Sequence, residues 1–78
     1  MHLEIVSPDK KIYSGEVSLV QLPGTIGSFE ILNNHAPLIS TLTNGKIKII
    51  DTEKKTEYFE IKSGVVEVKK NSIIVLVE

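Results

Sequence analysis

The sequence contains no cysteine, no arginine and no tryptophan, and only 5% of its residues are aromatic. Without cysteine the chain cannot form a disulfide, use a thiolate nucleophile or bind a metal through sulfur. Its nine lysines are balanced by ten acidic residues, giving a net charge of -1. Nucleic-acid binders typically show a basic excess and use guanidinium forks, so we expect no nucleic-acid partner.

Long apolar runs are also missing. None approaches the roughly 20 residues that a membrane-spanning helix requires. The opening residues Met1–Glu4 include neither the basic nor the apolar segment of a secretory signal peptide. These absences predict an intracellular chain without direct lipid insertion.

The residues that are present favour strands. The chain has 11 isoleucines, eight valines and five threonines in 78 residues, against one alanine. β-Branched side chains lose rotamer freedom on a helix and pack well on a pleated sheet. No segment keeps a helical period for three turns, and turn residues recur every eight to twelve positions. We expect one all-β domain spanning residues 1–78, a flattened sandwich or barrel of short, mostly antiparallel strands.

Alternating apolar residues predict which side chains face the core. The final run 73–77 is apolar at every position, so it should be a central strand covered on both faces, or one of its faces should meet a partner. The predicted inward-facing pairs are Leu3 and Ile5, Phe29 and Ile31, Ile47 and Ile49, Phe59 and Ile61, and Val66 and Val68.

Several short segments predict turns. Asn44-Gly45 is the strongest hairpin signal. A two-residue type I′ turn needs positive φ at both central residues, and asparagine followed by glycine adopts it readily. Further turns are expected at Ser14-Gly15, Asn33-Asn34, Thr52–Lys55 and Lys70-Asn71.

Catalytic and metal-binding patterns are weak. The two histidines, His2 and His35, are isolated, and His2 is far in sequence from candidate partners, whereas a zinc site needs three or four ligands. No serine lies in a nucleophile-elbow motif, and so small a domain rarely builds a substrate pocket. We expect no catalytic residue, no metal site and no cofactor.

Three local features leave alternatives open. Gly24-Thr25-Ile26-Gly27 resembles the loop of RNA-binding KH domains, but it lacks flanking helices and a basic groove, so a loop between strands is favoured. Lys54-Lys55 occupies a predicted hairpin tip, as the modified lysine of biotinyl and lipoyl carriers does; a solvated charged turn is the plainer interpretation. His35 is interpreted either as bonded to the backbone within a structured corner or as an interface residue.

An ordered set of segments resembles the N-terminal β-sandwich of the epsilon subunit of rotary F-type ATP synthases. The resemblance covers essentially the whole chain. Its central part is Gly27–Leu38, which ends in His35-Ala36-Pro37-Leu38, and Leu42 and Asn44–Ile47 follow it. The other matching segments are Leu3–Ser7, Tyr13–Val17, Gln21–Gly24, Ile61–Val68 and Asn71–Leu76. The chain departs from the family pattern at Ser28, where an acidic residue is common, although Glu30 on the same face could supply that charge.

The resemblance implies a sandwich of about ten strands and a non-catalytic rotor role. Such a subunit binds the gamma shaft and the membrane c-ring, reaches the catalytic head only indirectly, and is peripheral on the cytoplasmic side of a bacterial-type inner membrane. Because the sequence stops at Glu78, we expect no C-terminal helical domain and no inhibition through one. The alternative is an unrelated β module, either a lysine-modified carrier or a generic binding domain.

The resemblance also implies contact residues. Those assigned to the c-ring are Gly27, Ser28, Glu30, Asn33 and Asn34. Those assigned to gamma or to the corner beside it are Ser7, Pro8, His35, Ala36, Pro37, Leu38 and Thr41.

Overall fold

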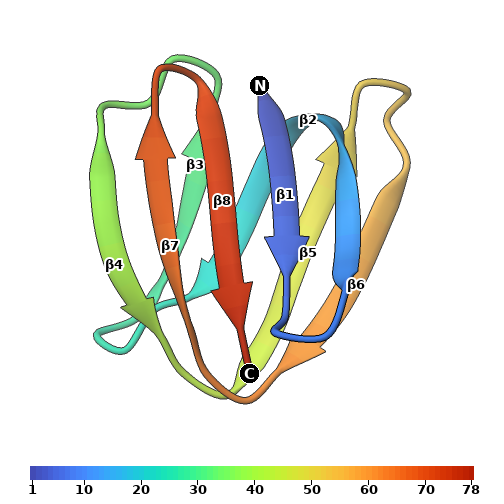
Figure 1. Cartoon of the computed structure of the whole chain (residues 1–78). Helices are drawn as coiled ribbons and strands as arrows, with labels where there is room; N and C mark the ends of the chain where they lie inside the picture. The colour runs from blue at the N-terminus through green and yellow to red at the C-terminus, as the bar shows by residue number, and fades with distance from the viewer.

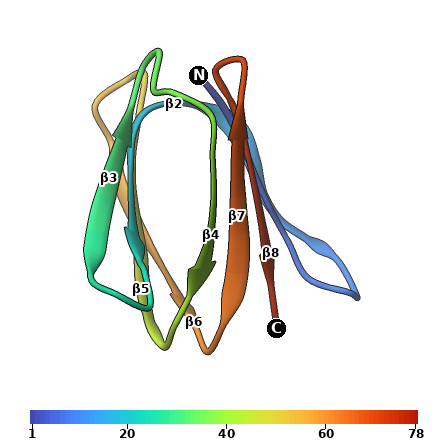
Figure 2. The same cartoon turned by 90° about the vertical axis from the view of Figure 1, so that its left-hand side faces the viewer.

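The computed structural model describes all 78 residues, which form eight β-strands and no helix (Figure 1). The strands are β1 (His2–Val6), β2 (Lys11–Pro23), β3 (Ser28–Leu32), β4 (Leu38–Leu42), β5 (Gly45–Asp51), β6 (Thr56–Ile61), β7 (Gly64–Lys69) and β8 (Ser72–Val77). Seen from the side, they form two layers facing each other (Figure 2). The predicted all-β sandwich is therefore confirmed.

The strand order is β4-β7-β8-β1-β2-β5-β6, and β3 pairs with β2. We call β4, β7, β8, β1 and the first half of β2 layer 1. Layer 2 contains the second half of β2 with β3, β5 and β6. β2 crosses from one layer to the other at an irregularity between Val17 and Leu19, where the Ser18 hydroxyl donates to the Ile50 carbonyl at 3.2 Å. The resemblance implied about ten strands; eight are present, and the longest of them serves both layers.

The two ends of the chain meet in layer 1. β1 and β8 pair in parallel, from His2 opposite Ser72 to Val6 opposite Leu76, whereas every other pairing is antiparallel. A single bridge between Gly24 and Leu42 links the layers along one side. Along the other side, the rings of Tyr13 and Phe59 pack with their centroids 5.6 Å apart.

The core between the layers is apolar throughout. It contains 16 buried apolar residues and no buried polar side chain. Eight of the ten side chains predicted to face inward are buried, and the remaining two, Phe29 and Phe59, are half-buried and pack against the core. The period-2 pattern of the sequence therefore identified the inner face of β1, β3, β5, β6 and β7.

The Asn44-Gly45 prediction is wrong, because the strands before and after it do not pair with each other. β4 pairs with β7 in layer 1, whereas β5 pairs with β2 and β6 in layer 2. Neither residue has positive φ. The glycine is needed for a close approach instead: a Cβ on Gly45 would lie 2.8 Å from the Cβ of Pro23.

The two-residue hairpin turn occurs at Lys70-Asn71, between β7 and β8. Its central residues have φ of 51° and 62°, and Lys69 pairs with Ser72, as a type I′ turn requires. Positive φ at Asn34 and Lys54 fits the other two predicted turns. Ser14-Gly15 is not a turn, because both residues continue β2 opposite β1.

Candidate interaction surfaces

The outer face of layer 1 exposes a group of apolar side chains. Along adjacent strands, Val65 lies opposite Leu76, and Leu76 lies opposite Val6. Ile39 and Ile74 lie in the next row along the strands, with Glu67 between them, and Ile39 has an exposed fraction of 71%. We call Val6, Ile39, Val65, Ile74 and Leu76 the apolar face.

This face resolves the two alternatives for the last strand. β8 is central in layer 1, between β7 and β1, but it is covered on one side only. Ile73 and Val75 point into the core, whereas Ile74 and Leu76 are exposed. The first alternative, coverage on both faces, is therefore wrong, and contact of the exposed face with a partner stays a prediction.

A shallow groove of about 570 Å³ lies at one end of the apolar face. Its lining includes Ser7 and Pro8 from the turn between β1 and β2, Thr41 from β4, and Val65 and Leu76 from the face itself. The fold thus brings together three residues that the sequence resemblance assigned to gamma. The resemblance did not assign Val65 or Leu76 to a contact, although the apolar character of every position in the last strand was a signal for Leu76.

The remaining residues assigned to gamma lie at the opposite end of β4. His35, Ala36 and Pro37 are exposed, and Leu38 is half-buried at the start of the strand. The His35 Nδ1–H donates to the Ala36 carbonyl at 2.7 Å, and its backbone N–H donates to the Leu32 carbonyl at 3.2 Å. His35 is therefore bonded to the backbone within a structured corner, as one interpretation expected, and its exposure leaves an interface role open to test.

The residues assigned to the c-ring are spread along the length of β3 and do not form one cluster. Gly27 and Ser28 lie at the start of the strand, Glu30 at its middle, and Asn33 and Asn34 beyond its end. Six residues of extended chain separate Gly27 from Asn33 by about 20 Å. Ser28 and Glu30 share the exposed outer side of layer 2, and the Gln21 side-chain amide donates to the Ser28 hydroxyl at 3.2 Å.

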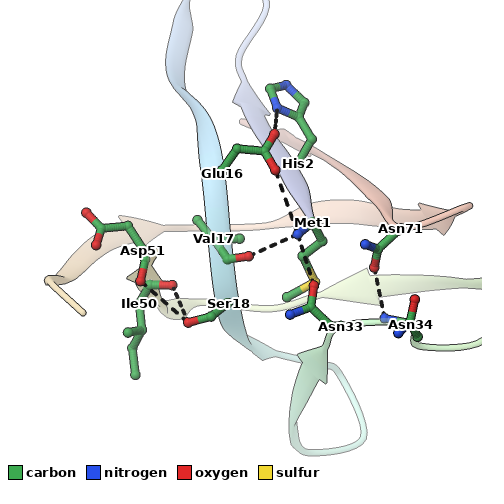
Figure 3. A network of polar contacts seen from close by, with 10 residues as sticks. All are labelled: Met1, His2, Glu16, Val17, Ser18, Asn33, Asn34, Ile50, Asp51 and Asn71. Atoms are coloured by element: carbon green, nitrogen blue, oxygen red, sulfur yellow. Dashed lines mark hydrogen bonds and ion pairs between the residues drawn. The ribbon is translucent and has the colours of Figure 1, made fainter. Parts of the chain in front are cut away.

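Asn33 belongs to a polar network around the amino group of Met1 (Figure 3). The Met1 ammonium donates to the Asn33 side-chain oxygen at 3.0 Å and to the Val17 carbonyl at 3.2 Å. Glu16 lies 3.8 Å from the same ammonium. Sequence reasoning could not find this contact, because the amino group and the amide are 32 residues apart.

Asn34 contributes through its backbone. Its N–H donates to the side-chain oxygen of Asn71 at 2.8 Å, which ties the turn after β3 to the turn between β7 and β8 (Figure 3). The two asparagines thus have structural partners, and their exposed surfaces are what remains for contact with another subunit.

His2 has acidic partners, contrary to the expectation that it is isolated. Its Nδ1 lies 3.0 Å from a Glu16 carboxylate oxygen, and its Nε2 lies 3.3 Å from one of Glu4. These contacts, with Glu16 contributing most, raise the pKa of His2 above the usual 6.5. Lys11 lies 4.0 Å from Glu4. The sequence did not reveal this group, because Glu16 is distant from His2 along the chain. Only the pairing between β1 and β2 brings Glu16 opposite His2.

The hairpin tip with Lys54-Lys55 is held by Asp51. One Asp51 carboxylate oxygen accepts hydrogen bonds from the backbone N–H groups of Glu53 at 2.8 Å and of Lys55 at 2.9 Å. Lys55 also lies 3.8 Å from the Glu53 carboxylate, and both side chains are exposed. The geometry fits the solvated charged turn.

Three further features concern metal binding, membrane crossing and the Gly24–Gly27 loop. No three histidine, aspartate or glutamate side chains converge so that they could hold a metal ion. The chain contains no helix with the length and apolar character that crossing a membrane demands. The Gly24–Gly27 loop joins β2 to β3, as the plainer interpretation of this glycine pair predicted.

Comparisons with solved structures identify the fold of this β-sandwich, and comparisons with sequences identify its family. Chains of the same fold occur in cryo-EM structures of two mitochondrial ATP synthases. In the Euglena gracilis OSCP/F1/c-ring structure, the match has a TM-score of 0.90 at 17% identity, covering 96% of this chain and 48% of that one. In the Tetrahymena thermophila central stalk/c-ring structure, the match has a TM-score of 0.83 at 20% identity, covering 99% of this chain and 62% of that one. At these identities the likeness shows the fold alone.

The family follows from the sequence matches. The model of the ATP synthase delta/epsilon chain β-sandwich domain matches residues 1–78. The ATP synthase epsilon chain of Caulobacter vibrioides is 38% identical over 78 residues, covering all of this chain and 90% of the relative. That of Chlorobium limicola is 42% identical over 76 residues, covering 97% and 86%. The chain therefore belongs to the ATP synthase delta/epsilon family, and residues 1–78 match the β-sandwich domain of that family.

Proposed function

We propose that this chain is a non-catalytic rotor subunit of the central stalk in a proton-transporting ATP synthase. It binds the gamma subunit and the membrane c-ring and contacts the catalytic head only indirectly. Family membership supports this role, as does the fold it shares with chains of a central stalk/c-ring structure. A peripheral position at the cytoplasmic side of a bacterial-type inner membrane goes with the role, since the named epsilon-chain relatives are bacterial.

The observation that carries the gamma assignment is the apolar face. A small domain usually scatters its exposed apolar side chains, whereas here Val6, Val65 and Leu76 are contiguous on neighbouring strands. Contiguous apolar surface marks protein contacts, and the adjoining groove contains Ser7, Pro8 and Thr41. Gamma binding would cover this face and add to the small core of a chain of this length.

A charge in the apolar face tests this assignment. Leu76→Glu should weaken binding to purified gamma by at least about 10-fold, because burial of a leucine side chain contributes about 1.5–3 kcal/mol and a buried unpaired charge costs more. Isothermal titration calorimetry with gamma measures the change.

Leu32→Glu is the matched control. Leu32 has an exposed fraction of 52%, against 54% for Leu76, but it lies on the outer side of layer 2. It should bind gamma as the unsubstituted chain does. Equal loss in both variants, or none in either, would remove the gamma assignment from the apolar face.

The c-ring assignment rests on β3 and on the loop before it. Glu30 is exposed, forms no ion pair within the chain and shares a face with Ser28. Glu30→Lys should lower the amount of c-ring that co-purifies with the gamma complex from solubilised membranes. Glu60→Lys, an equal charge change on exposed β6, should leave recovery unchanged. Unchanged recovery with Glu30→Lys would exclude Glu30 from the contact.

The role as a whole is tested by native mass spectrometry of the tagged chain from membranes of its own host. Recovery with gamma, catalytic subunits and the c-ring, at unmodified mass, is the expected result. Recovery with a lysine-linked mass increment and a soluble enzyme would support a carrier instead.

A further inference from the structure

Ile26 is the most exposed large apolar residue of the chain. It lies in the loop between β2 and β3, and its exposed fraction is 102%, compared with 71% for Ile39, the next highest. Single exposed apolar side chains are common on protein surfaces, so exposure alone does not indicate a contact. The structure of the loop adds the second observation.

The loop holds Ile26 outward. The Gly27 N–H donates to the Gly24 carbonyl at 3.1 Å and closes the loop. Thr25 is bound to Thr41 twice, through its N–H to the carbonyl at 3.3 Å and between the two hydroxyls at 3.0 Å. These bonds fix both sides of Ile26, so its side chain cannot fold back onto the sandwich without breaking them.

Close packing at the base of the loop also restricts it. A Cβ on Gly24 would lie 2.6 Å from the Gly27 carbonyl oxygen and 2.8 Å from the Phe29 ring. The loop is thus packed against its own β3 strand. A restrained loop backbone loses little conformational freedom on binding, which favours an interface contact.

The surroundings of Ile26 favour a protein partner over a lipid surface. Residues 24–29 include no charged side chain, whereas lipid-binding segments combine several apolar residues with a basic cluster. Next to Ile26 are Thr25, which has a small side chain, and Gly27, which has none, so a partner can approach closely.

We propose that Ile26 is an apolar anchor that inserts into an apolar socket of the partner at this end of the sandwich. Gly27 and Ser28, the next two residues, belong to the proposed c-ring contact, so the socket is on the c-ring; this inference rests on the proposed function. The anchor makes ring binding depend on apolar volume at position 26, in addition to the charge at Glu30.

A graded series of substitutions tests the anchor. The complex of this chain with gamma is titrated onto immobilised, detergent-solubilised c-ring from the same host. Ile26→Val should weaken binding about 4-fold, since it removes one methylene, and Ile26→Ser should weaken it by at least about 10-fold. Both variants should keep the thermal midpoint and gamma affinity of the unsubstituted chain, because the side chain contacts no core residue.

Tyr58→Ser provides the control, because it also removes an exposed apolar side chain but lies on β6. It should bind the ring normally. If Ile26→Ser binds the ring normally, or loses gamma affinity and keeps ring affinity, the anchor proposal is overturned while the rotor function stands. If the unsubstituted complex does not bind the ring, the c-ring part of the proposed function fails and the anchor fails with it.

Discussion

At the scale of the residue, the carboxylates beside His2 couple its protonation to folding. Glu16 and Glu4 raise the pKa of His2 in the folded chain above the usual 6.5. The imidazolium therefore stabilises the fold fully below about pH 6.5, and this contribution is lost as the pH rises through the folded-state pKa. We expect His2→Gln to remove this part of the pH dependence, measured by urea unfolding across that range.

The origin of the effect can be checked on the same residue. Glu16→Gln removes the largest cause, so the pKa of His2 should fall towards 6.5, as followed by NMR titration of the ring protons. A titration midpoint at or below 6.5 in the unsubstituted chain would contradict the contacts seen between β1 and β2.

At the scale of the element, the turn of the β7–β8 hairpin holds one residue in a conformation that its side chain disfavours. Lys70 has φ of 51°, a left-handed conformation that costs about 1–2 kcal/mol for most L-residues and less for asparagine. Lys70→Asn should therefore raise the free energy of unfolding by about 0.5 kcal/mol, measured by chemical denaturation.

The same substitution one residue earlier is the comparison. Lys69 pairs with Ser72 within the ladder, where asparagine is disfavoured, so Lys69→Asn should lower stability slightly. If both variants were equally destabilised, the left-handed turn would not be the controlling feature.

At the scale of the whole molecule, the two layers share one core and one strand. Because β2 contributes to both layers, loss of packing in one layer should weaken the other. Ile73→Ala removes a fully buried side chain of layer 1 and should cost about 2–5 kcal/mol. Hydrogen exchange of the slowest amides of β5, in layer 2, should accelerate by the same factor as that of β8.

Ile74→Ala distinguishes this cooperative response from a local one. Ile74 is the next residue, but it belongs to the exposed apolar face, so its loss should leave exchange in β5 nearly unchanged. A layer 2 that stayed protected in Ile73→Ala would mean that the layers open independently.

The family resemblance named candidate contact residues but not their arrangement. It named Ser7, Pro8 and Thr41, which the fold brings to one groove, although they come from different strands and turns. It also named Gly27 and Asn33 as one set, and the structure places them at opposite ends of β3. Ile26 could not be recognised in advance, because a sequence does not show that an isoleucine is held out of the core.

The sequence by itself determined the all-β class and the inner face of the five strands with a clear alternation, because both follow from residue type and from a period of 2. Only the tertiary structure decided which strands are neighbours. Asn44-Gly45 has the local chemistry of a hairpin, yet β4 and β5 belong to different layers, so the connection crosses between them. The partners of His2 and Asn33, and the free side of β8, depend equally on pairing between distant segments. Such pairing is set by the packing of the whole core, which local sequence does not encode.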